Sequence, residues 1–192
     1  MRLTSGIELT TAITNVVIYI VSLYGFFAIK KDKLWKFFYF LMTIDSFLGV
    51  IVHGLEMSIQ LNVLLWLILA ITFTITVNTF LVIFLKIKAR YIILFSILLS
   101  LLLLAEIHHG MDFILTFTLY VLLSIIISTY KIVKSKINNK EYFLAGILVQ
   151  ITGGILMLSK VSIGEVNHNG IYHLFMALTL AIFLIGIKKN SK

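Results

Sequence analysis

The chain has 192 residues, of which 60 % are hydrophobic and 12 % are charged, and it contains neither cysteine nor proline. Soluble domains carry about 25 % charged residues, so this composition excludes a soluble globular enzyme, and its apolar content excludes intrinsic disorder. The lack of cysteine excludes disulfides, thiolate metal sites, iron–sulfur clusters and a cysteine nucleophile. We therefore expect a polytopic membrane protein with a single domain, residues 1–192.

Seven stretches are long and apolar enough to cross a bilayer, because a hydrocarbon core of about 30 Å requires about 20 residues of helix. They cover residues 7–29, 34–56, 61–85, 88–107, 112–130, 142–159 and 170–187. The pattern predicts an all-α protein, a bundle of seven transmembrane helices. The first stretch has no cleavage site of small residues followed by a soluble chain, so it is interpreted as a permanent span and not as a signal peptide.

Basic residues are concentrated at one set of helix ends. Fourteen of the sixteen lie there: Lys30, Lys31, Lys33, Lys36, Lys86, Lys88, Arg90, Lys131, Lys134, Lys136, Lys140, Lys188, Lys189 and Lys192. The positive-inside rule then predicts an outer N-terminus and a cytoplasmic C-terminus. The net charge of +8 is explained by this topology and predicts contact with membrane lipids. No nucleic-acid partner is expected, since no basic stripe with interleaved aromatic residues extends beyond the membrane.

The acidic residues have the opposite distribution. Five lie at the predicted outer ends: Glu8, Glu56, Glu106, Asp112 and Glu165. The abundance of Ile, Leu, Lys and Asn is typical of AT-rich bacterial genomes, so we expect the bacterial cell membrane as the location.

The second stretch carries the most informative polar residues. At about 100° per residue, Ser46, Gly49, His53 and Glu56 share one helix face. Asp45 lies near the middle of the bilayer, where an unpaired carboxylate costs at least about 2.5–3.5 kcal/mol. Asp45 is therefore expected to be neutral and hydrogen-bonded to a threonine or asparagine of a neighbouring helix, or to orient a metal-ligating histidine or transfer protons.

All five histidines lie at the same predicted side of the membrane: His53, His108, His109, His168 and His173. Neutral histidine is the commonest metal ligand, which favours a metal site at this side. The alternatives are structural. His173 could be a buried histidine satisfied by a carbonyl or an acid, and His168 a solvated loop residue.

Other polar residues have simpler explanations. The corner of residues 106–112 is expected to contact lipid headgroups, with entry of Glu106 or His109 into the site as the second interpretation. The threonines and Asn78 of the third stretch are expected to form hydrogen bonds between helices. Gly146, Gly153 and Gly154 of the sixth stretch are expected to let a neighbouring helix approach closely.

Seven spans with a histidine at the end of the second and histidines at the start of the seventh resemble the superfamily of alkaline ceramidases and adiponectin/progestin receptors. That superfamily has Ser-x3-His on its second core helix and His-x3-His on its seventh. Here His53 matches the first histidine and His173 the last, while Gly49 and Asn169 stand four residues before them. The middle histidine would be supplied by His168.

The resemblance implies a zinc ion held by His53, His168 and His173, and hydrolysis of a ceramide-like lipid amide or an ester. An open three-histidine site activates a zinc-bound water for attack on a carbonyl. Ser46 is expected to hold the oxyanion and Asp45 or Glu56 to orient a ligand or carry protons. Possible additional site residues are His109, Glu106 and Asn169.

Three other functions remain open on the sequence. Asp45 and the histidines could bind a proton or a metal ion reversibly in a transporter, a channel or a sensor. His53 and His173 could be axial ligands of a b-type haem. The bundle could also have a purely structural or assembly role. Retinal binding is excluded, because the seventh stretch has no lysine between Ile171 and Ile187.

Overall fold

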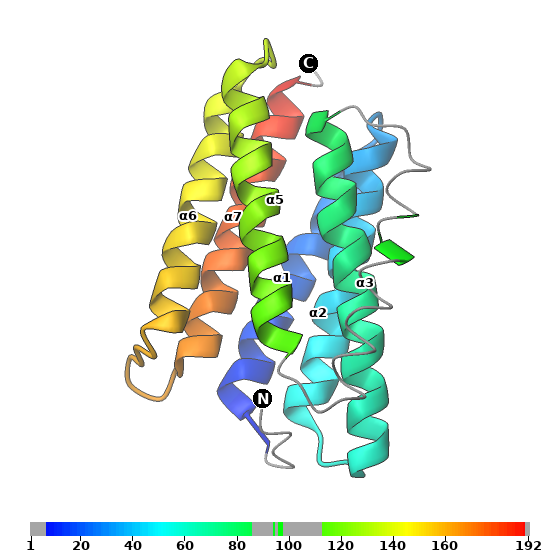
Figure 1. The fold of residues 1–192 in the computed structure, drawn as a ribbon, viewed down its shortest axis with the longest axis vertical. Helices are drawn as coiled ribbons and strands as arrows, with labels where there is room; N and C mark the ends of the chain where they lie inside the picture. Colours follow the sequence, from blue (N-terminus) through cyan, green and yellow to red (C-terminus); the bar gives the residue numbers. More distant parts are fainter. Residues whose placement is uncertain (1–6, 86–93, 95, 98–112, 191–192) are drawn as a thin grey trace.

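A computed structural model describes residues 7–85, 94, 96–97 and 113–190, with the backbone alone for 113–119. The described residues form six helices: α1 (Leu9–Ala28), α2 (Lys33–Gly54), α3 (Ile59–Leu85), α5 (Phe113–Lys134), α6 (Lys140–Leu158) and α7 (His168–Asn190) (Figure 1). They confirm six of the predicted helices to within a few residues at each end. The predicted fourth span, 88–107, lies outside the described residues except for 94, 96 and 97.

Five of these helices, α1, α2, α3, α6 and α7, are long and apolar enough to cross a membrane. Large apolar side chains cover their outer surfaces. Phe27 of α1 and Leu148 of α6, for example, are 67 % and 65 % exposed. Soluble monomers rarely expose continuous apolar surfaces of this kind, whereas lipid tails cover them without cost. The chain is therefore a membrane protein.

The six described helices form a ring in which each packs against the next. α1 packs against α2, α2 against α3, α3 against α5, α5 against α6, α6 against α7, and α7 returns to α1. The N-terminal end of α1 lies at one end of the bundle and the C-terminal end of α7 at the other (Figure 1). α2 runs antiparallel to α1 and α7 runs parallel to α1, so His53 at the end of α2 and His173 near the start of α7 lie at the same end as Glu8.

The opposite end of the ring is closed by aromatic side chains. Trp35, from the first turn of α2, stacks on Phe143 of α6 at 5.4 Å between ring centroids, and Phe80 of α3 stacks on Phe183 of α7 at 5.5 Å. Next to them, the buried Tyr39 hydroxyl donates to the carbonyl oxygen of Leu180 at 2.5 Å. These contacts tie α2, α3, α6 and α7 together at the end where the described lysines gather.

Glycines of α6 allow α7 to approach, as the sequence predicts, at two of three positions. A Cβ atom on Gly153 would lie 2.5 Å from the Cβ of Phe175, and one on Gly146 would collide with the ring of Phe183. A Cβ on Gly154 would meet nothing within 4 Å. Gly153 and Gly146 therefore set the distance between α6 and α7, and Gly154 does not.

This difference predicts opposite effects for two adjacent substitutions. Gly153→Ala forces α7 away from α6, so we expect a loss of about 1–3 kcal/mol of stability. Gly154→Ala adds a methyl group in open space and improves helix propensity, so stability is expected to stay the same or rise by up to about 1 kcal/mol. Thermal unfolding in detergent micelles measures both, and equal melting temperatures for the two variants would contradict this packing.

Candidate functional site

His53 and His173 form the centre of the polar end of the bundle. His53 lies in the last turn of α2 and His173 in the second turn of α7, and their ring centroids are 6.1 Å apart. Both side chains are half-buried. The structure thus brings together two of the histidines that the sequence singles out, from helices that are far apart along the chain.

Glu8 holds the imidazole of His53. Its Oε2 atom lies 3.2 Å from Nδ1 of His53, and its backbone N–H donates to the His53 carbonyl oxygen at 2.8 Å. The Oε2 atom has no hydrogen-bond partner among the described residues, so this contact is electrostatic, and a carboxylate beside Nδ1 favours a hydrogen on that nitrogen. The lone pair of Nε2 is then available to another group.

Thr14 of α1 lies next to the imidazole of His173. Its Oγ1 donates to the carbonyl oxygen of Thr11 at 2.9 Å and lies 3.3 Å from Nδ1 of His173. The direction of the contact with Nδ1 depends on the tautomer of His173: Thr14 accepts from a protonated Nδ1 and donates to an unprotonated one. Each imidazole therefore has an oxygen atom of Glu8 or Thr14 next to its Nδ1.

Asn167 fixes the start of α7 against α1. Its Oδ1 accepts hydrogen bonds from the Gly170 backbone N–H at 2.8 Å and from the Thr11 hydroxyl at 3.1 Å. Such an N-terminal cap satisfies amides that the first helical turn leaves free. The cap holds the first turn of α7, and with it His173, in register with α1.

Two further contacts surround the histidine pair. The ring of Trp66, from α3, meets His53 edge to face at 5.3 Å. Gly49 of α2 makes room for α1, because a Cβ atom there would lie 2.6 Å from Oδ1 of Asn15. The site is thus built from α1, α2, α3 and α7.

Sequence reasoning missed Glu8, Thr14, Asn167 and Trp66 as neighbours of the histidines. The sequence does indicate a role for Asn167 at the start of α7, since an asparagine directly before a helix is a common N-cap. Glu8 stood among the acids of this end, and which acid reaches His53 depends on how α1 packs. Tryptophan is common near either end of a membrane span, so Trp66 carried no signal of a site.

Several predicted site residues lie elsewhere. Glu56 is not on the face of His53, because α2 ends at Gly54 and Leu55 has extended backbone angles. Ser46 is buried and donates to the Met42 carbonyl oxygen of its own helix at 2.7 Å. Neither residue contacts a histidine in the described part of the chain. The acid that the structure places next to His53 is Glu8 and not Glu56.

His168 is the first residue of α7, so the expectation that it lies in a loop or the first turn is confirmed. Five residues of helix separate it from His173 by a rotation of about 140°, which directs the two side chains to different faces. Among the described residues, no group of three His, Asp or Glu side chains could hold a metal ion. His168 thus does not complete a site with His53 and His173. His168 and Asn169 form no hydrogen bond with described residues, and Glu106 and His109 lie outside them.

Asp45 is a second buried polar group, away from the histidines. It is 4 % exposed, and its Oδ2 lies 2.7 Å from the hydroxyl oxygen of Thr76 on α3. Its Oδ1 has no partner among the described residues. The structure confirms the predicted bond between Asp45 and a threonine of the next helix.

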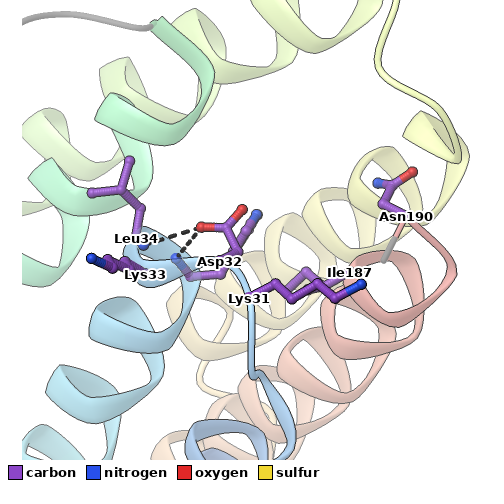
Figure 2. A pocket seen from close by; sticks show the side chains of 7 residues that line it. Lys31, Asp32, Lys33, Leu34, Ile187 and Asn190 are labelled. Atoms are coloured by element: carbon purple, nitrogen blue, oxygen red, sulfur yellow. Dashed lines mark hydrogen bonds between the residues drawn. The ribbon is translucent and has the colours of Figure 1, made fainter. Parts of the chain in front are cut away.

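Two cavities lie away from the histidine pair. One, of about 100 Å³, lies in the middle of the bundle between α2, α3, α5, α6 and α7, and Thr76, Gln150 and Tyr172 are among its lining residues. The other, of about 620 Å³, lies at the lysine-rich end. Figure 2 shows that Lys31 and Asp32 line it from the turn before α2 and Lys33 from the start of α2, with Asn190 across from them. Asp32 caps α2, since its carboxylate accepts from the backbone amides of Leu34 and Trp35.

Residues 10–192 match the model of a family of unknown function, DUF6962, and the chain therefore belongs to that family. No curated protein and no solved structure matches it.

The contact between Glu8 and His53 predicts a defined tautomer. In protein labelled with ¹⁵N-histidine, we expect the neutral His53 ring to carry its hydrogen on Nδ1. Glu8→Ala removes the acceptor, so this preference is expected to weaken, whereas Thr14→Val is expected to leave the His53 signals unchanged. Nitrogen NMR in micelles measures both. A His53 ring with its hydrogen on Nε2 in the unsubstituted protein would contradict the assignment.

Proposed function

We propose that this member of the DUF6962 family binds a zinc ion at His53 and His173 and is a hydrolase that acts on a lipid amide or ester. The observation that carries the proposal is the pair of imidazoles with ring centroids 6.1 Å apart, each with an oxygen atom next to Nδ1. Histidines that ligate metals usually donate their other ring N–H to a carboxylate or another oxygen, and Glu8 and Thr14 supply these oxygens here.

The imidazoles of His53 and His173 fit two of the ligand positions of a zinc site. Two imidazoles that bind one zinc through nitrogens at about 2.0–2.1 Å have ring centroids about 5–6 Å apart. The separation of 6.1 Å between His53 and His173 is close to this range. Catalytic zinc sites usually have three protein ligands, and the described residues supply two.

The chain's own residues would hold and shield the site. Glu8 would favour electron donation from Nε2 of His53, because its carboxylate lies 3.2 Å from Nδ1. Trp66 covers the edge of the same ring and limits the approach of water from α3. When bound, zinc polarises a substrate carbonyl and lowers the pKa of a bound water to about 7. The resemblance to ceramidases in the spans, in His53 and in His173 supports a lipid amide as the substrate class.

The arrangement of the basic residues supports an outward-facing site. The described lysines of the turn before α2, of the segment between α5 and α6, and of the last turn of α7 share the end opposite to the histidines (Figure 1). With the basic end in the cytoplasm, the histidine pair faces the outside. A substrate would then come from the outer leaflet or the outer aqueous space.

Metal analysis tests the binding step. We expect about one zinc per chain in protein purified without chelator, and its loss in His53→Ala and His173→Ala. His168→Ala is the matched control and is expected to retain zinc, because His168 is on another face of α7. Retention of zinc in both His53→Ala and His173→Ala would refute these ligands. A Soret absorption band would instead identify a haem protein.

Trp66 offers an independent readout of the same site. Addition of Cu²⁺ to metal-free protein is expected to quench tryptophan fluorescence, because the indole lies against His53. Trp66→Phe leaves Trp35, at the opposite end, as the remaining tryptophan and is expected to abolish most of the quenching. Equal quenching in this variant would place the Cu²⁺ elsewhere.

Hydrolysis is tested separately with fluorescent lipid amides and esters in liposomes. We expect product release that a chelator stops and zinc restores, and a loss of at least about 100-fold in His53→Ala, because zinc would both activate the attacking water and polarise the substrate carbonyl. Bound zinc without hydrolysis of any lipid amide or ester would overturn the enzymatic proposal. Flux of zinc across the liposome membrane would then identify a transporter.

A further inference from the structure

We propose that Asp45 is a proton-binding site inside the bundle, where its protonated carboxyl group hydrogen-bonds α2 to α3. The inference concerns a different region from the histidine pair and does not depend on a bound metal. It rests on the hydrogen-bond geometry around Asp45 and Thr76.

Thr76 has one hydroxyl hydrogen and two acceptors within reach. Its Oγ1 lies 2.7 Å from Oδ2 of Asp45 and 3.0 Å from the carbonyl oxygen of Thr72. If Asp45 is ionised, Thr76 can donate fully to one of them, and the other contact loses its hydrogen. If Asp45 is protonated on Oδ2, the acid donates to Thr76 and Thr76 donates to Thr72. Protonation of Asp45 therefore gives a hydrogen to each of the two oxygen–oxygen contacts of Thr76.

The surroundings of Asp45 also favour the neutral acid. The side chain is 4 % exposed, and Oδ1 has no partner among the described residues. A charged oxygen without a donor in an apolar medium is far more costly than a neutral carbonyl oxygen in the same place. With a proton on Oδ2, the unpartnered Oδ1 is such a carbonyl oxygen.

No described charge compensates an ionised Asp45. α3, which supplies Thr76, contains no acidic, basic, histidine or tyrosine residue. The nearest titratable residues along α2 are Tyr39 and His53, six and eight positions away. α1 and α5 contribute Tyr19 and Tyr24, and Tyr120 and Tyr130 with Lys131 and Lys134, respectively. α6 and α7, which pack against α2 and α3 through aromatic side chains, contribute Lys140, Glu141, Tyr142, His168, Tyr172, His173, Lys188 and Lys189. None of these side chains forms an ion pair with Asp45 in the described part.

The protonation state of Asp45 affects how α2 packs on α3. The bond between Asp45 and Thr76 joins α2 to α3 deep in the bundle. Loss of the proton leaves an uncompensated charge on Asp45. This charge is stabilised only if water enters or if α2 and α3 separate. Protonation of Asp45 thus stabilises the closed packing of α2 on α3, and release of the proton favours its opening.

Infrared spectroscopy of the full chain in lipid nanodiscs tests the proposal. At pH 7, exposed carboxyl groups are ionised. We expect one C=O band of a protonated, buried carboxylic acid, which Asp45→Asn removes. Asp32→Asn is the matched control, because Asp32 is exposed and asparagine also caps helices; this variant is expected to keep the band.

Thr76 variants test the geometry. Thr76→Ser keeps the hydroxyl group and is expected to keep the frequency of the band. Thr76→Val removes the acceptor of the acid proton, so the band is expected to move to the higher frequency of a carboxyl group without a hydrogen bond. An unchanged frequency in Thr76→Val would refute the assigned bond.

The unsubstituted protein alone can overturn the proposal, even if a variant fails to fold. Absence of a protonated carboxyl band at pH 7 would show that Asp45 is ionised. A band that disappears when Na⁺ replaces a large organic cation in the buffer would show that the site binds sodium and not a stable proton. A band that persists in folded Asp45→Asn would belong to another acid.

Discussion

Inside a bilayer, every polar group that a helix brings into the hydrocarbon must find its partner within the protein, because no water can replace it. This constraint explains the polar contacts of the bundle. Threonine and serine hydroxyls such as those of Thr43, Thr74 and Ser124 donate to carbonyl oxygens four residues earlier in their own helices. Asn78 of α3 bonds to Tyr120 of α5 and to Ser96. Polar residues that cannot be satisfied locally therefore determine which helices lie side by side.

The same constraint makes the two ends of the ring different. At the lysine-rich end, stacked rings such as those of Trp35 and Phe143 pack between the helices and need no polar partner. At the other end the interior contains imidazole, carboxylate, hydroxyl and amide groups that bond to one another. Rigid apolar packing at one end positions the helices, so that the polar groups at the other end meet with little freedom. A binding site is better supported by such packing than by loops.

The positions of the helices could be predicted from the sequence because bilayer thickness sets a minimum length for an apolar stretch. The meeting of His53 and His173 followed from the alternating direction of the spans, which brings both residues to one end. The sequence did not identify the acid that contacts His53. Regular helical spacing favoured Glu56, but α2 ends at Gly54, and Glu8 reaches His53 from the start of α1. The role of His168 depended in the same way on one helix boundary, since a residue inside the first turn of α7 cannot swing towards His173.

The acid that contacts His53 comes from the start of α1 and not from α2, and this affects how the site is assembled. Glu8 contacts His53 with both its backbone and its side chain, and Thr11 and Thr14 of the same helix contact Asn167 and His173. The first two turns of α1 therefore join the end of α2 to the start of α7. Because α1 orients both rings, the site is complete only when α1 is packed between them, which ties the chemistry of this end to the assembly of the whole ring.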